Sequence, residues 1–107
     1  FVQPDLRTVG FSHTIRMADV ASRYNAGLVP HNWQSELGKA MGVHLAKLRT
    51  NIPFVEDDRW SNFALDTSKY QFRNGRWFAP EAPGWGVCVN DHYDRFAESE
   101  EEWSITA

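Results

Sequence analysis

The stretch GLVPHNW, residues 27–33, joins a short apolar run to a polar loop. Leu28, Val29 and Pro30 predict a short buried strand, and His31 stands where that strand ends. Periodic apolar patterns lie on both sides of this stretch, so the strand is expected between two helices.

The first helix is predicted over about residues 12–24, with Ser12 placed to cap it. Its apolar face follows the spacing i, i+3, i+4, i+7 through Met17, Val20, Ala21 and Tyr24. Gly27 suits a left-handed position after that helix. The second helix has a longer apolar face, made of Leu37, Ala40, Met41, His44, Leu45 and Leu48.

Two further short strands are predicted, at Phe1–Gln3 and at Pro53–Val55. The order is then strand, helix, strand, helix, strand with short connections, which is typical of parallel βαβ units. The predicted fold class is therefore α/β. An Asn74-Gly75 pair between Phe72 and Trp77 predicts a hairpin in the C-terminal third.

Ionisable residues follow all three predicted strands. Asp5, His31 and Glu56 occupy these positions, after intervals of 26 and 25 residues. The carboxyl ends of parallel strands share one edge, which in barrels of eight βα units carries the chemistry. Each residue also has a structural alternative: Asp5 could cap the following loop, His31 could flank a helix, and Glu56 could pair with Arg59.

Other polar residues are weaker candidates for a functional role. His44 lies on an apolar helix face, which favours a core histidine, whereas His13 could line a pocket beyond Asp5. Asn32 could contact a polyhydroxy substrate, although Asn32 or Ser35 could equally cap the second helix. Asp57 and Asp58 are interpreted as part of a solvated charge run.

Composition and charge limit the kinds of binding partner that the sequence predicts. The chain has 107 residues and a formal net charge of −3, and residues 94–107 hold five acidic residues and one basic one. The sequence shows no basic patch of the kind that indicates nucleic-acid binding, and it has no apolar run long enough for a transmembrane helix. Cys88 is the single cysteine, so neither a disulfide framework nor a cysteine metal cluster is predicted.

The strand ends QPD (3–5), PH (30–31) and Glu56, with VG at 9–10, resemble the enolase superfamily. The closing stretch FRNGRWFAPEAPGWGVCV, residues 72–89, is similar to that of the mandelate racemase-like branch, which includes acid-sugar dehydratases. Two positions depart from the pattern: Phe11 follows Gly10 where a second glycine is common, and Trp85 stands where leucine is usual.

The resemblance implies an architecture. Residues 1–65 would be the last three βα units of a (β/α)7β barrel, with strands six to eight and two helices. Residues 66–96 would close onto a capping domain, and residues 97–107 would form an acidic tail. The capping domain, a lysine base motif and the ligands of Mg²⁺ would all lie upstream, so the 107-residue chain alone is expected to be inactive.

The resemblance also implies roles. His31 would move a proton beside a carboxylate, since its ordinary pKa lies near neutrality. Asp5 would accept the His31 N–H, and Glu56, protonated, would donate to an enediolate oxygen. Asn32 and His13 would contact substrate, and no metal ligand is expected in this sequence.

The predicted function is a Mg²⁺-dependent acid-sugar dehydratase, acting in the cytoplasm as a homo-oligomer on a small sugar acid. Two alternatives stay open. The same proton abstraction could serve a racemase or cycloisomerase, and the isolated chain could be a non-catalytic binding module.

Overall fold

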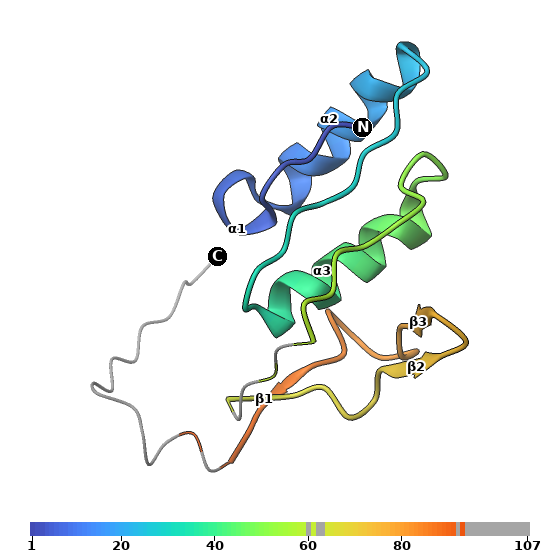
Figure 1. The fold of residues 1–107 in the computed structure, drawn as a ribbon. Helices are drawn as coiled ribbons and strands as arrows, with labels where there is room; N and C mark the ends of the chain where they lie inside the picture. The colour runs from blue at the N-terminus through green and yellow to red at the C-terminus, as the bar shows by residue number, and fades with distance from the viewer. Residues whose placement is uncertain (60, 62–63, 92, 94–107) are drawn as a thin grey trace.

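The computed structural model describes residues 1–59, 61, 64–91 and 93. Three helices come first, followed by two small antiparallel sheets (Figure 1). The helices are α1 (Leu6–Val9), α2 (Phe11–Arg23) and α3 (Glu36–Leu48). The strands are β1 (Leu65–Asp66), β2 (Gln71–Arg73), β3 (Arg76–Phe78) and β4 (Cys88–Val89). The predicted acidic tail, 97–107, lies outside the described residues.

The first two predicted strands lie side by side and run parallel, as expected. Isolated parallel bridges join Val2 to Leu28 and Asp5 to His31. The backbone N–H of Val29 donates to the Val2 carbonyl over 2.9 Å, and the His31 N–H donates to the Pro4 carbonyl over 2.9 Å. The carboxyl ends of these two segments therefore meet at one edge.

The predicted regular strands are nevertheless wrong for all three segments. The first two make only isolated bridges, and Pro53–Val55 is extended without a strand assignment. The third segment joins its neighbour where the Leu28 N–H donates to the Asn51 carbonyl over 2.9 Å. Pro4, Pro30 and Pro53 have no backbone N–H, which interrupts the ladder in segments this short.

The loop predicted after Asp5 contains a helix. α1 occupies one turn, and Gly10, at φ 81°, stands between α1 and α2. Ser12 does not cap α2, because α2 begins at Phe11 with Gly10 as its N-cap. The left-handed residue after α2 is Asn25, at φ 54°, and not Gly27. Gly27 is needed for close approach instead, since a Cβ there would lie 2.4 Å from the Phe1 ring.

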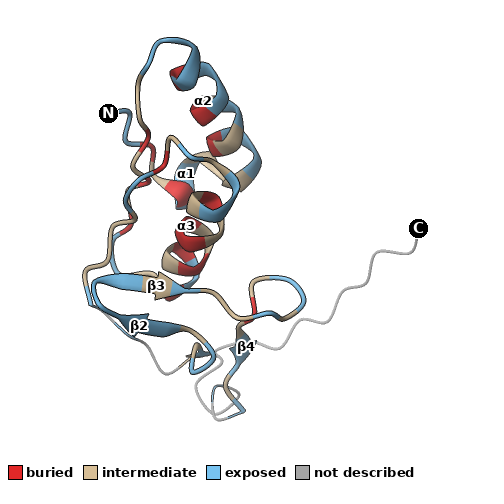
Figure 2. Cartoon of the chain, turned by 90° about the vertical axis from the view of Figure 1, so that its right-hand side faces the viewer, coloured by how far each residue is buried: buried red, intermediate tan, exposed pale blue. Residues whose placement is uncertain are grey.

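The core lies between the helices and the extended segments, where Figure 2 shows the buried residues gathered. Its buried side chains are Leu6, Ala18, Leu28, Leu45 and Ile52. The face predicted for α2 is only partly correct. Ala21 is buried and Met17 packs against the core, but Val20 is 52% exposed and Tyr24 is 79% exposed.

An apolar groove runs along the exposed part of α2. Val2 and Val9 line it together with His13, Met17 and Val20 of α2 and with Tyr24, which follows α2. We call it the edge groove. It explains why the α2 periodicity extends beyond the core, since Val20 and Tyr24 belong to the exposed groove and not to the buried cluster.

α3 begins where a serine caps it. The Ser35 hydroxyl accepts the Gly38 N–H over 3.0 Å, which settles the choice between Asn32 and Ser35 in favour of Ser35. Gly38 and Gly42 let α3 approach the extended segments closely. A Cβ on Gly42 would lie 2.7 Å from Val55 Cγ1, and one on Gly38 would lie 2.2 Å from Asn32 Oδ1.

The Ser35→Ala variant should lower the free energy of unfolding by about 0.5–2 kcal/mol, because the Gly38 N–H loses its acceptor at the helix start. Ser35→Asp keeps an acceptor at that position and should stay close to the wild type. Urea unfolding of the three proteins measures the difference. Equal losses in both variants would show that the hydroxyl does not act as a cap.

The predicted hairpin is confirmed. β2 and β3 pair antiparallel with Phe72 opposite Trp77, and Asn74 (φ 51°) and Gly75 (φ 75°) make the two-residue turn. Further along, β4 returns to pair antiparallel with β1, Leu65 opposite Val89. Residues 64–91 thus fold back beside α3 (Figure 1).

Aromatic side chains join this returning stretch to the helices. The Trp85 ring lies 4.7 Å from that of Phe11 on α2 and 5.4 Å from that of His44 on α3, centroid to centroid. His44 Nε2 is 3.1 Å from the Tyr70 hydroxyl, which donates to the Trp85 carbonyl. His44 is therefore a packed, hydrogen-bonded histidine, as its helix position predicts.

Candidate functional site

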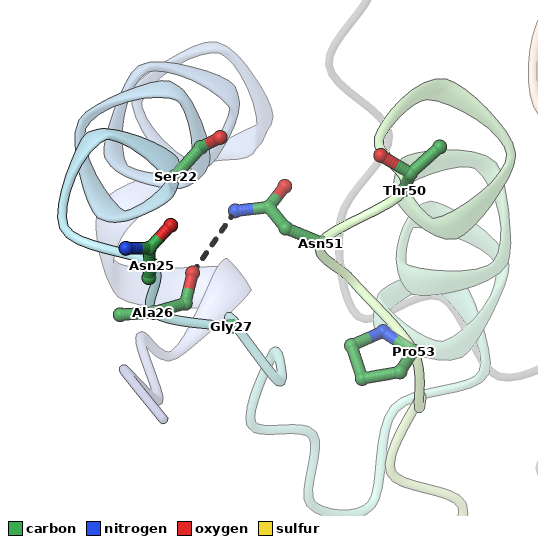
Figure 3. A pocket seen from close by; sticks show the side chains of 7 residues that line it. All are labelled: Ser22, Asn25, Ala26, Gly27, Thr50, Asn51 and Pro53. Carbon is green, nitrogen blue, oxygen red and sulfur yellow. Dashed lines mark hydrogen bonds between the residues drawn. The ribbon is translucent and has the colours of Figure 1, made fainter.

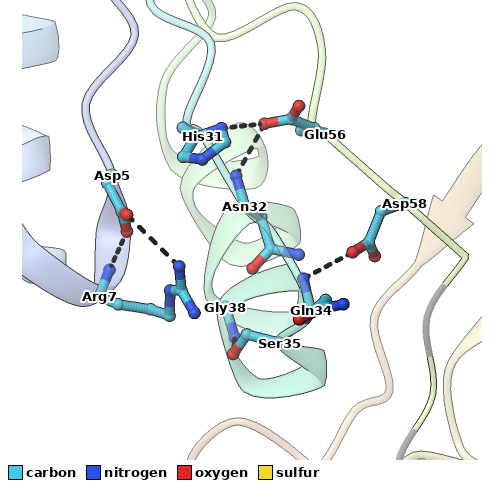
Figure 4. A network of polar contacts seen from close by, with 9 residues as sticks. All are labelled: Asp5, Arg7, His31, Asn32, Gln34, Ser35, Gly38, Glu56 and Asp58. Atoms are coloured by element: carbon cyan, nitrogen blue, oxygen red, sulfur yellow. Dashed lines mark hydrogen bonds and ion pairs between the residues drawn. The ribbon is translucent and has the colours of Figure 1, made fainter.

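His31 and Glu56 come together at the carboxyl ends of their extended segments (Figure 4). His31 Nδ1 lies 2.7 Å from Glu56 Oε2, and the Asn32 backbone N–H donates to the same oxygen over 2.8 Å. Their side chains are 37% and 34% exposed, so a solute can reach the pair.

These contacts define how the imidazole is held. The Asn32 N–H can only donate, so Glu56 Oε2 acts as an acceptor, and Nδ1 is assigned as the protonated ring nitrogen. The second ring nitrogen, Nε2, then carries the lone pair. A histidine whose Nδ1–H is fixed by a carboxylate can accept or return a proton through Nε2.

Asp5 does not join the imidazole, so the predicted side-chain pair of Asp5 and His31 is wrong in this structure. Its backbone pairs with that of His31, but its carboxylate accepts the Arg7 N–H over 2.8 Å and caps α1. The Arg7 guanidinium lies 3.6 Å away. The alternative in which Asp5 acts as a cap is correct, because α1 presents free N–H groups beside the carboxylate.

This arrangement affects the acidity of Asp5. The hydrogen bond from the Arg7 backbone holds the pKa of the Asp5 carboxyl below its usual value, and the Arg7 charge lowers it further. Asp5 is therefore an ionised neighbour of the pair near neutral pH.

The side chains of Asn32 and His13, the two residues predicted to contact substrate, make no contact with the His31–Glu56 pair among the contacts described. Asn32 is 2% exposed, and its side chain packs against Gly38 of α3 with no hydrogen-bond partner among the described residues. Only its backbone N–H reaches the site, so a substrate contact by its side chain is wrong for this geometry. His13 is exposed on α2 and lines the edge groove.

Sequence reasoning missed Asp57. Its side chain is 11% exposed, accepts the Trp77 indole N–H over 2.9 Å, and lies 3.7 Å from Lys39 Nζ. Asp58 accepts the Gln34 backbone N–H over 2.6 Å. The interpretation as a solvated charge is therefore wrong for Asp57, whereas Asp58 is half-buried and its hydrogen bond is exposed. Arg59 pairs with Asp57, and not with Glu56 as the structural alternative proposed.

A second depression lies at the opposite ends of the extended segments (Figure 3). It measures about 340 Å³ and is lined by residues that include Ser22, Asn25, Thr50 and Asn51. The Asn51 amide donates to the Ala18 carbonyl over 2.8 Å and the Ala26 carbonyl over 3.3 Å. Asn51 is thus occupied in tying α2 to the segment after α3, which is a structural role.

The described part of the chain contains no group of three or more His, Cys, Asp or Glu side chains that could hold a metal ion. The described residues therefore offer no Mg²⁺ site of that kind. None of the helices within the described ranges is long and apolar enough to cross a membrane.

Comparisons with known proteins identify the family of the chain and solved structures of similar fold. The family described as enolase C-terminal domain-like matches residues 1–93. A crystal structure of galacturonate dehydratase from Geobacillus sp., complexed with D-galacturonate and 5-keto-4-deoxy-D-galacturonate, is similar at a TM-score of 0.79 and 26% identity. The match covers 88% of this chain and 25% of that one.

Two other solved structures match equally well. One is a mutant of the same dehydratase complexed with Mg, at 26% identity and a TM-score of 0.79, over 88% of this chain and 25% of that one. The other is a mandelate racemase/muconate lactonizing protein from Geobacillus sp. Y412MC10, complexed with magnesium and tartrate. It matches at 26% identity and a TM-score of 0.79, over 88% of this chain and 24% of its own. The chain thus spans about a quarter of the length of these structures. No curated protein sequence matches it.

Proposed function

Because the chain belongs to the enolase C-terminal domain-like family, in its mandelate racemase and muconate lactonizing branch, we propose that it supplies the catalytic histidine of an acid-sugar dehydratase. The observation that carries the proposal is the pair of His31 and Glu56, joined over 2.7 Å at one edge of the extended segments. The similarity to a galacturonate dehydratase adds the substrate class.

In this proposal residues 1–65 form the last three units of a (β/α)7β barrel. The segments 1–5, 28–31 and 51–56 are its sixth, seventh and eighth strands, and residues 66–96 close the domain. The edge groove supports this arrangement, since its apolar side chains are suited to pack against a preceding βα unit. Completing the barrel would also cover the unpaired edge of the first segment.

The reaction requires a proton to leave the carbon beside a carboxylate. His31 Nε2 takes that proton, and the resulting enediolate expels the hydroxyl of the next carbon. The His31 imidazolium returns the proton to that hydroxyl, which leaves as water. The enol product then becomes a keto acid. Glu56 holds the His31 Nδ1–H and stabilises the imidazolium that forms, which is the role that the sequence suggested for Asp5.

Asp5 stays a third candidate in this site because its backbone pairs with His31. Its carboxylate reaches the ring only if it exchanges its contacts with Arg7 for one with the imidazole. The ligands of Mg²⁺ belong outside the described residues, and the metal would stabilise negative charge on the substrate.

The test is an assay of the complete protein that carries this chain. Purified protein with Mg²⁺ is incubated with a panel of sugar acids that includes D-galacturonate, and keto-acid formation is followed. We expect at least one sugar acid to lose water, and excess EDTA to stop the reaction. Racemisation or cycloisomerisation without water loss would replace the dehydratase proposal, and no turnover of any carboxylate would favour a binding module.

A further inference from the structure

Asp57 is a nearly buried carboxylate directly after Glu56, and it contacts two other parts of the chain and one residue of its own segment. The Trp77 indole N–H of β3 donates to Oδ2 over 2.9 Å. Lys39 Nζ of α3 lies 3.7 Å from Oδ1 and 4.9 Å from the centre of the Trp77 ring. The Arg59 N–H donates to Oδ1 over 3.0 Å. Asp57 thus joins the β2–β3 hairpin, α3 and the segment that carries Glu56.

Asp58 fixes the other side of the same segment. Its carboxylate accepts the Gln34 N–H over 2.6 Å (Figure 4). Gln34 adopts a left-handed φ of 52°, in the loop between His31 and α3. The chain immediately after Glu56 is therefore held by two side chains, one bonded to the hairpin and one to the loop that comes after His31.

The charge of Asp57 matters because burial is costly for a carboxylate without partners. Here the Lys39 and Arg59 cations and the Trp77 indole N–H offset that cost, and Lys39 also contacts the Trp77 ring. Asp57→Asn removes the ion pairs and leaves one acceptor oxygen, so either the Trp77 N–H or the Arg59 N–H then faces an amide NH2. The segment at 56–58 would then lose its attachment to the hairpin.

We propose that Asp57 is a positioning residue, which holds the Glu56 carboxylate against His31 by bonding residues 56–58 to Trp77 and Lys39. The inference rests on the proposed function, and it extends that function to the β2–β3 hairpin. The hairpin then helps to fix the catalytic pair although none of its residues touches His31 or Glu56 among the contacts described.

The experiment uses the complete protein with two variants. Asp57→Asn keeps the side-chain volume but removes the charge, and Trp77→Phe keeps an aromatic ring but removes the N–H donor. Glu81→Gln is the matched control. It removes an acidic partner of α3 from the same C-terminal third, since the exposed Glu81 pairs with Lys47 over 3.7 Å. Two quantities are measured in each variant: kcat and KM on the sugar acid, and hydrogen exchange at single amides.

The exchange measurement reports on Glu56 without requiring turnover. The Asn32 N–H donates to Glu56 Oε2, whereas the Val29 N–H donates to the Val2 carbonyl. In Asp57→Asn, Asn32 should exchange about tenfold faster, as expected for the loss of one hydrogen bond, while Val29 stays at its wild-type rate. Trp77→Phe should change Asn32 exchange in the same direction, and Glu81→Gln should change neither amide.

The kinetic result should agree. Asp57→Asn should lower kcat by roughly 10–100-fold with a smaller change in KM, because the general base is misplaced while binding groups elsewhere remain. A variant that melts earlier but keeps kcat and Asn32 exchange at wild-type values would overturn the proposal. If the wild type turns over no sugar acid, the proposed function fails, and the exchange result alone still decides the role of Asp57.

Discussion

The complete protein with His31→Asn should lose turnover by at least about 10²–10⁴-fold, the range typical of a general acid or base. Asparagine is polar and of similar size, so the fold should tolerate it. Its amide cannot exchange a proton near neutral pH, whereas the Nε2 of an imidazole held at Nδ1 can. The measurement is kcat on the sugar acid that the wild type converts.

Two controls separate chemistry from structure in this variant. Mg²⁺ affinity should be unchanged, because the proposal assigns no metal ligand to this chain. The thermal midpoint should fall only modestly, since the side chain is 37% exposed. More than about a tenth of wild-type turnover would contradict the assignment, since it lies far above the residual activity expected without the base.

The largest loss of stability is expected for Leu45→Ala, at about 2–5 kcal/mol of unfolding free energy. Leu45 is fully buried in the cluster with Leu6, Ala18, Leu28 and Ile52, where α3 faces the extended segments. Truncation there removes apolar contacts and leaves a cavity that close-packed neighbours fill only in part.

Leu48→Ala is the matched control, because Leu48 is the last residue of the same helix and is exposed. It should change the unfolding free energy by less than about 1 kcal/mol. Urea unfolding of both variants beside the wild type gives the comparison. Equal shifts in the two midpoints would show that the core between α3 and the extended segments does not hold the fold together.

Features that depend on neighbouring residues were predictable from the sequence. The Asn74-Gly75 pair specifies a two-residue turn by its left-handed backbone, and the hairpin results from it. The periodic apolar positions of α3 likewise predict a helix, whose start is fixed by the local bond from Gly38 to Ser35. The parallel pairing of the first two segments is also a consequence of the helical connection between them, which returns the chain to the same end before the second segment begins.

Side-chain partners far apart in sequence were not predictable. In the sequence, Asp57 is one charged residue in the run from Glu56 to Arg59. Only the folded chain brings Trp77, twenty positions away, to its carboxylate. Asp5 had two acceptable partners, the adjacent imidazole and the free N–H groups of α1. The choice between them depends on α1, a single helical turn that is too short for a periodic pattern to predict.

The contact between Phe11 and Trp85 changes how the two departures from the family pattern should be understood. Each looks like an independent exchange in the sequence, yet their rings meet edge to face at 4.7 Å. Both positions carry a larger side chain than the family pattern has, and the two rings pack against each other where the returning stretch meets the start of α2. Consensus engineering that restores glycine at one position and keeps tryptophan at the other would therefore remove the Phe11 ring from the face of Trp85.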